Sequence, residues 1–333
     1  MAALLSTVLG QPTALQTLRR ALGSGRAHHA YLFDGPDGVG KERAAFGLAQ
    51  ALVCERRQAG NADACGECSA CTRALPREGE RRPAHPDVVV LERGLYDAAA
   101  IGRRTPEAQD ISIDQVRTLV LARAAFPPYE GRAKVFIVRR AEELNPSAAN
   151  ALLKTLEEPG ARTHFVLLTA SGDALLPTIR SRTQRVRFGT LTDEVMTGLL
   201  LASGVEPERA AELSRLAGGS MATAKMLADP EASAQRQEFL ARAMAAIDAR
   251  DLGPGLELAE DAKKVDKDSL AAYLTTLAAA FHAKACATAG APDRQATVAA
   301  ERHRLATEAI ELLGGNAAAQ LTVEAMLIQM RAA

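Results

Sequence analysis

A phosphate-binding loop is indicated by the glycine-rich stretch GPDGVGK. Its glycines, Gly35, Gly38 and Gly40, let backbone N–H groups turn inward around a phosphate, and Lys41 could reach the outer phosphates of a nucleotide. The next residue departs from the pattern, because Glu42 stands where a Ser or Thr would place a hydroxyl on Mg²⁺. We therefore expect a degenerate nucleotide site. The sequence leaves open whether nucleotide still binds, and a glycine turn without any ligand is the structural alternative.

Four cysteines have the spacing of a metal site. Cys65, Cys68 and Cys71 form two successive C-x-x-C pairs, and Cys54 lies a short loop upstream. Four thiolates suit tetrahedral Zn²⁺, and such a closed shell leaves no position for water or substrate, so we expect a structural metal. An iron–sulfur cluster takes the same ligands and is the alternative, but nothing else in the sequence indicates redox chemistry. The fifth cysteine, Cys286, is expected in a helical core.

The elements around the loop alternate between strands and helices. Short apolar or alternating runs predict five strands, at residues 31–33, 87–91, 134–138, 164–169 and 184–188. Helical spacing fills the intervals, an amphipathic helix over 14–22 precedes the first strand, and Asn145-Pro146 predicts the start of a later helix. Breaks expected at 253–255 and 290–292 separate long helices in the C-terminal part. This alternation predicts an α/β fold with a mostly parallel five-stranded sheet covered on both faces. The glycine loop then lies at a strand-to-helix turn, the place where a phosphate loop belongs.

The strand predicted at 134–138 ends in Arg139 and Arg140. In P-loop ATPases the corresponding strand ends in acidic residues that hold Mg²⁺ and orient the attacking water. Glu142 and Glu143 lie past the strand end and are expected on the surface. Two unit charges 4 Å apart interact by about 4 kcal/mol at an effective dielectric of ~20. This energy is roughly doubled for a divalent ion, and micromolar binding is worth about 8 kcal/mol in all. An arginine directed into the metal site would therefore abolish Mg²⁺ binding.

Composition limits the kinds of partner and compartment. The chain has 333 residues, 47% of them hydrophobic, with 40 basic and 40 acidic residues. No overall field therefore draws it to nucleic acid or to an anionic membrane, and any DNA contact must be local or shared with partners. The apolar runs are far shorter than a bilayer span and the N-terminus lacks the pattern of a signal peptide, so we expect a cytoplasmic protein.

Several motifs resemble the AAA+ subunits of bacterial DNA polymerase III clamp loaders. The matching motifs are Gly10-Gln11, RAHHAYLFDGP at 26–36, the four-cysteine insertion, NPSAANALLKTLEEP at 145–159, LPTIRSRTQ at 176–184 and GGNAAAQLTVEAMLIQM at 314–330. The resemblance covers the whole chain. It implies a AAA+ P-loop domain over 1–190 with a zinc module at 54–71, an all-helical lid over 191–231 and an all-helical collar, through which subunits assemble, over 232–333.

The resemblance also implies roles for particular residues. In that family a Ser-Arg-Cys triplet supplies an arginine finger to the ATP of a neighbouring subunit, and Ser181, Arg182 and Thr183 match it here, with Thr183 in place of the cysteine. The family's zinc ligands match the four cysteines one for one. The family also expects a nucleotide-sensing arginine shortly after a Gly-Ser pair in the lid. This chain has no arginine in the stretch from Ser220 to Ala224.

The function that the resemblance implies is that of a non-hydrolysing clamp-loader subunit, which helps to place the sliding clamp on primed DNA. Its expected partners are the gamma, tau and delta subunits, the clamp and primed DNA, with no membrane; its expected cofactor is structural Zn²⁺, and ATP binding is doubtful. One alternative is an ATP-hydrolysing subunit like gamma or tau, which Glu42, Arg139 and Arg140 oppose. Another is a small-molecule P-loop kinase with a zinc finger, which the long helical C-terminal part supports poorly.

Overall fold

The computed structural model describes residues 4–101, 110–288, 294–314 and 317–333. The chain forms two compact units, one made of residues 1–205 and 218–221 and the other of residues 206–217 and 222–333. Among the described residues, no helix is both long and apolar enough to cross a membrane. The three-domain division at residues 190 and 231 stays a prediction.

A five-stranded parallel sheet in the order β2-β3-β4-β1-β5 forms the centre of the first unit. Its strands are β1 (Ala30–Asp34), β2 (Val88–Leu91), β3 (Lys134–Val138), β4 (Thr163–Thr169) and β5 (Gln184–Arg187). All residues of β1, β2 and β3 are buried, as expected for parallel strands covered on both faces. The fold class and the five strands expected from the sequence are confirmed.

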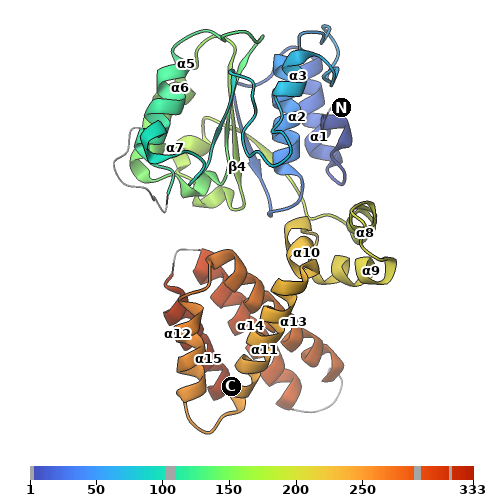
Figure 1. Ribbon diagram of the computed structural model, residues 1–333, viewed down its shortest axis with the longest axis vertical. Helices are drawn as coiled ribbons and strands as arrows, with labels where there is room; N and C mark the ends of the chain where they lie inside the picture. Colours follow the sequence, from blue (N-terminus) through green and yellow to red (C-terminus); the bar gives the residue numbers. More distant parts are fainter. Residues whose placement is uncertain (1–3, 102–109, 289–293, 315–316) are drawn as a thin grey trace. The chain divides into compact units, whose positions relative to one another are not determined.

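Helices cover both faces of this sheet (Figure 1). One face carries α1 (Pro12–Gly23), α2 (Lys41–Val53) and α3 (Ser69–Arg73). The other carries α4 (Ile113–Gln115), the π-helix η3 (Val116–Leu121), α5 (Ala122–Ala124), α6 (Pro146–Glu157) and α7 (Pro177–Arg180). Their apolar side chains pack on alternate strand residues, and the rings of Phe136 and Phe165 stack with centroids 5.1 Å apart. Helical spacing predicted the helix before β3 but not its π-helical middle.

Short turns and one further helix complete the first unit. Four 3-10 helices are η1 (Leu4–Thr7), η2 (Ala98–Ile101), η4 (Ala141–Glu143) and η5 (Gly172–Ala174), and α8 (Asp193–Ala202) follows β5. Helix α6 begins where the sequence predicts, because the Asn145 side chain accepts a hydrogen bond from the Ala148 N–H (2.8 Å) and Pro146 occupies the first helical position.

The second unit is entirely helical in its described part. Its helices are α9 (Pro207–Leu216), most of α10 (Met221–Ala228), α11 (Pro230–Asp248), α12 (Gly253–Ala262), α13 (Lys267–Thr288), α14 (Arg294–Gly314) and α15 (Ala319–Ala332). The helices from α11 through α15 share one apolar core, in which Phe281 and Leu274 are fully buried. The break expected at Gly253 to Gly255 is displaced, because these residues form the first turn of α12, where the missing N–H of Pro254 costs no helical bond.

Two further sequence expectations concern α13 and the segment after it. Cys286 is exposed, 3.6 Å from His282 Nε2, so its expected place in the core is wrong. The chain break expected at residues 290–292 lies outside the described residues.

Candidate functional site

The glycine loop connects the end of β1 to the start of α2, as the sequence predicts. Gly35, Gly38 and Gly40 all have positive φ, at 154°, 75° and 100°. A side chain at Gly35 would place its Cβ 2.0 Å from the carbonyl oxygen of Phe188, so only glycine fits where the loop passes under the end of β5. Backbone geometry therefore requires these glycines whether or not a phosphate binds.

Lys41 is turned back onto its own loop. Its side chain is 7% exposed and its ammonium donates to the carbonyl oxygens of Gly35 and of Pro36, the latter at 2.7 Å. The Asp37 carboxylate lies 3.3 Å from the same nitrogen. A lysine that bonds phosphate must direct this group outward, whereas here its donors are used to close the loop.

The remaining carbonyl groups of the loop are also occupied. They accept hydrogen bonds from Ser220 Oγ (to Asp37, 2.7 Å), from Met221 N (to Gly38, 3.2 Å) and from Gln11 Nε2 (to Val39, 3.2 Å). The buried Gln11 amide also pairs with Gly189, donating to its oxygen (2.7 Å) and accepting from its nitrogen (3.0 Å). Every carbonyl from Gly35 to Val39 thus has a donor, and the loop is held as a closed turn.

Arg139 lies where the strand end meets the loop helix. Its Nη2 pairs with Glu42 Oε1, and its Nη1 lies 2.7 Å from Glu92 Oε2. The parallel register sets Leu91 beside Val138, so Glu92 follows β2 at the point where Arg139 follows β3. The side chain of Arg139 is 12% exposed. Two of the departures from the ATPase pattern, Glu42 and Arg139, therefore pair with each other.

The acidic residues beyond this strand do not replace the missing metal ligands. Glu143 lies 3.5 Å from Arg140 and 3.6 Å from Arg93, and Glu142 accepts a hydrogen bond from the Ala170 N–H (3.3 Å). In the part of the chain that the structure describes, the cysteine cluster is the one group of three or more side chains that could hold a metal ion.

Ser181 and Arg182 lie between α7 and β5, away from the glycine loop. Gln184 is the first residue of β5 and lies beside Tyr31, whereas the glycine loop follows Asp34. Arg182 and the loop therefore lie at opposite ends of the strands, about 10 Å apart along the strand direction. Arg182 pairs with Glu157, a partner that sequence reasoning missed, and donates to the Thr178 oxygen at 2.9 Å.

The arginines near Arg182 have partners of their own. Arg180 pairs with the exposed carboxylate of Asp173 at 2.7 Å. Arg185 binds Asp34, with Nε 2.7 Å from Oδ2, and Asp34 also accepts from the Gly172 N–H at 2.9 Å. Arg185 therefore helps to fix the end of β1, which sequence reasoning also missed.

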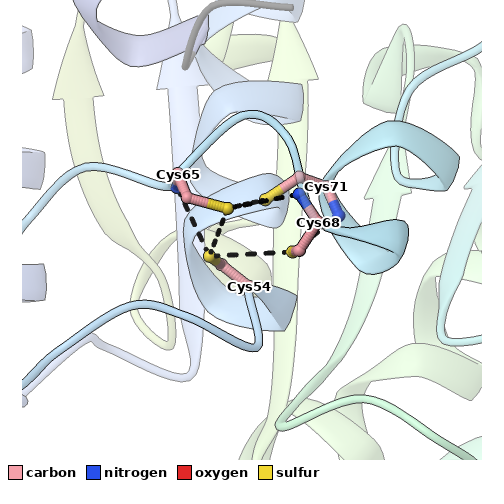
Figure 2. A group of neighbouring side chains, drawn as sticks. All are labelled: Cys54, Cys65, Cys68 and Cys71. Atoms are coloured by element: carbon pink, nitrogen blue, oxygen red, sulfur yellow. Dashed lines mark hydrogen bonds between the residues drawn. The ribbon is translucent and has the colours of Figure 1, made fainter.

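The four cysteines converge beside the end of α2, where Cys54 follows the last helical residue (Figure 2). All four sulfurs lie within 4.8 Å of one another, with separations of 3.6 Å from Cys54 to Cys65, 3.8 Å from Cys65 to Cys71 and 4.0 Å from Cys54 to Cys68. Four sulfurs placed about 2.3 Å from a central zinc lie about 3.8 Å apart. The cluster thus has the dimensions of a tetrahedral thiolate site.

Backbone groups around the cluster favour thiolates. The N–H groups of Cys65, Cys68 and Cys71 point at the sulfurs of Cys54, Cys65 and Cys68, at 3.3 to 3.5 Å. Burial opposes ionisation of Cys65, but the N–H groups of Glu67 and Cys68, together with the thiols of Cys68 and Cys54, outweigh it and lower the pKa of that thiol to about 6. Burial and the neighbouring sulfurs raise the pKa of Cys71. A positive ion at the centre would offset this second effect.

The sequence is similar to that of DNA polymerase III subunits. It is 38% identical over 193 residues to the gamma/tau subunit of Mycobacterium tuberculosis, covering 58% of this chain and 30% of that protein. It is 39% identical over 230 residues to the delta' subunit of Pseudomonas aeruginosa (68% and 63%), and 31% identical over 206 residues to that of Bacillus subtilis (62% and 56%). The chain thus spans less than two thirds of the length of each of these relatives.

A solved structure and a family model also match. The solved gamma subunit-related protein of Thermotoga maritima superposes with a TM-score of 0.46 at 18% identity, covering 95% of this chain and 98% of that one. The family described as "DNA polymerase III, delta subunit" matches residues 10–192, more than half of the chain and nearly all of the strands and helices of its first unit. Together with the delta' relatives, this match shows that the chain belongs to the DNA polymerase III delta subunit family.

Proposed function

We propose that this chain is a non-hydrolysing subunit of a bacterial clamp loader, which helps to load the sliding clamp onto primed DNA. Its partners would be the gamma, tau and delta subunits, the clamp and, through the complex, primed DNA in the cytoplasm. Family membership supports the assembly. The observation that carries the non-hydrolysing role is the position of Arg139 between Glu42 and Glu92.

The ion pair of Arg139 with Glu42 leaves a nucleotide-bound Mg²⁺ without its usual ligands. The metal of a P-loop ATPase lies between the hydroxyl after the loop lysine and an acid at a strand end. Here Glu42 and Arg139 occupy those two positions and neutralise each other. Since Lys41 is also committed to the loop's own carbonyls, phosphate binding would require breaking both arrangements.

Arg182 is the residue through which this subunit would act on a neighbour's ATP. It lies at the end of the strands opposite the chain's own glycine loop, which supports a role at the site of a different subunit. Its pairing with Glu157 joins side chains that are 33% and 46% exposed. Ion pairs of this kind are worth roughly 0.2–1 kcal/mol, so the guanidinium can leave Glu157 for a γ-phosphate at small cost. Ser181, within 3.3 Å of Arg182, would orient it.

The cysteine cluster would hold one structural Zn²⁺ through Cys54, Cys65, Cys68 and Cys71. Four sulfur ligands leave no open position for water, so the metal would stabilise the fold and take no part in a reaction. Cys54 directly follows α2, and Cys71 lies in α3, so the ion would hold both ends of the loop between these helices together.

Steady-state ATP hydrolysis by the purified chain tests the proposal. We expect no Mg²⁺-dependent turnover, alone or with primed DNA. A rate near 1 per second that disappears in Lys41→Ala would instead favour the second candidate, a gamma- or tau-like ATPase. The 38% identity to the gamma/tau subunit of M. tuberculosis is the observation in favour of that candidate.

A further inference from the structure

Two adjoining hollows of the first unit are lined by arginines. The larger, about 410 Å³, is lined in part by Arg57, Arg132 and Arg162. The smaller, about 340 Å³, is lined in part by Arg20 and Arg26, and the two share a lining residue at the end of α1. Among the described residues that line either hollow, there is no Asp or Glu. We name these five arginines the basic face.

The basic face is separate from the glycine loop. Its larger hollow reaches Ala133, just before β3, and His164, the second residue of β4, so it lies at the amino edge of the sheet. The glycine loop lies at the carboxyl edge, beyond β1. None of the residues that close the loop, such as Lys41 or Gln11, lines either hollow.

Two of the arginines are held in place by the backbone. Arg57 donates through Nε to the Ala51 oxygen (2.7 Å) and through Nη1 to the oxygens of Leu22 (3.2 Å) and Asn61 (3.0 Å). Arg132 donates through Nη1 to the Arg57 oxygen at 2.6 Å. Nη2 takes part in none of these bonds in either side chain, so each guanidinium is fixed while its Nη2 keeps two donors for a ligand.

The side chains of Arg57 and Arg132 hold two positive charges close to each other. Burial and the neighbouring Arg132 both lower the pKa of the Arg57 guanidinium. Arg162 is exposed and holds its backbone in the left-handed region, with φ of 63°, an uncommon conformation for a residue other than glycine. No ion pair found in the described parts of the chain involves any of the five arginines of the basic face. An anion would remove the repulsion that the fold leaves in place.

We infer that the basic face binds the sugar–phosphate backbone of a single-stranded nucleic acid. Its charges extend over two hollows instead of converging on one point, which suits a chain of phosphates better than a single compact anion. No Phe, Tyr or Trp occurs among the described lining residues, so the face offers no stacking platform for bases. A flexible single strand can place successive phosphates in the two hollows, whereas the phosphates of a duplex are fixed on a convex surface. Binding should therefore be independent of sequence and strongly dependent on salt.

The test measures binding of the full chain to a fluorescent oligothymidylate by anisotropy between 50 and 200 mM salt. The variant replaces three exposed arginines together, Arg20→Ser, Arg26→Ser and Arg162→Gly, the last with a residue that accepts the left-handed backbone. Each lost phosphate contact lowers the salt slope on a single strand by about 0.7 and the affinity at 0.1 M by about fivefold. We expect the slope to fall by about 2 and the affinity by about a hundredfold.

A matched control removes the same charge elsewhere, through Arg77→Ser, Arg215→Ser and Arg250→Ser, three exposed arginines that line neither hollow. The control should bind as the wild type does, and both triple variants should keep the wild-type melting temperature. Equal losses in the two variants, or no loss in either, would overturn the inference.

Two further ligands separate the possible sources of phosphate. Tighter binding of a blunt duplex than of the single strand would overturn the single-strand assignment. So would stabilisation of the chain by millimolar inorganic phosphate without any binding of the oligonucleotide. The measurement needs neither ATP nor another subunit, so its outcome does not depend on the proposed clamp-loader role.

Discussion

Replacing Arg139 by Met should destabilise the first unit by about 2 kcal/mol. The substitution keeps most of the aliphatic packing, but leaves Glu92, 18% exposed, without the less exposed of its two cationic partners. Removing one partner of a fully buried pair costs about 3–5 kcal/mol, whereas exposed pairs are worth about 0.2–1 kcal/mol. The Arg139–Glu92 pair lies between these limits. Glu42 is half-exposed and contributes little, and Arg81 remains as a second partner of Glu92.

The assay is urea unfolding followed by circular dichroism, in a double-mutant cycle of Arg139→Met and Glu92→Gln. We expect a coupling energy of about 1–2 kcal/mol, because the double variant removes both charges and leaves no orphan. Additive effects, or a loss below about 0.5 kcal/mol for Arg139→Met, would refute the assignment of this contact as a structural ion pair.

The same variant tests the functional argument. Arg139→Met should gain no Mg²⁺-dependent ATP hydrolysis, since Lys41 and the loop carbonyls remain committed to each other. Hydrolysis appearing in this single variant would mean that one charge alone disables an otherwise intact nucleotide site.

Three further outcomes are expected. Arg182→Ala should leave the reconstituted complex assembled but remove most of the DNA- and clamp-stimulated ATPase of the neighbouring site, because fingers supplied in trans are worth about 10³–10⁵ in rate in GTPases; Arg180→Ala is the control, and equal rates would reduce Arg182 to a surface charge. Elemental analysis should find one zinc per chain and none in Cys68→Ser, which should also melt lower; iron, or an unchanged variant, would contradict this. Asp87 is buried, and three N–H groups, at 2.6 to 2.9 Å, outweigh burial and lower the pKa of its carboxyl group. The stability it contributes is present above its unfolded pKa near 4 and is lost as pH falls through the lower folded value. Asp87→Asn should therefore cost about 2 kcal/mol at pH 7 and progressively less as the pH falls below 4, and an equal cost at every pH in urea unfolding would contradict this.

Apolar periodicity was sufficient to predict the sheet and most helices around it. The buried runs of β2 and β3 have too few polar residues for any other placement, and Asn145-Pro146 carries its own helix start. The cysteines were equally informative, because short spacing already forces their sulfurs together. The strands, the start of α6 and the cysteine cluster could each be predicted because the residues that determine them are close together in the sequence.

The ion pairs could not be predicted in the same way, because their partners are distant in sequence. Glu42 and Arg139 are each recognisable as departures from the ATPase pattern, but their contact depends on where β3 lies in the sheet. Glu92 had a usable signal, since it directly follows one predicted strand as Arg139 directly follows the next, and these two strands pair in the structure. The basic face had none, because its arginines come from α1 and from separate loops that only the folded chain brings together.

The π-helix over Val116–Leu121 has a consequence for comparing this chain with its relatives. A π-turn accommodates one more residue than an α-turn. The segments before and after it therefore keep the relative orientation that they would have in a regular α-helix without the extra residue. Val116, Leu119 and Val120 all reach the core in this arrangement. A homologous chain with one residue fewer here could form a regular α-helix and bury the same side. A one-residue gap between Val116 and Leu121 is therefore the alignment that preserves the physical equivalence of the flanking positions.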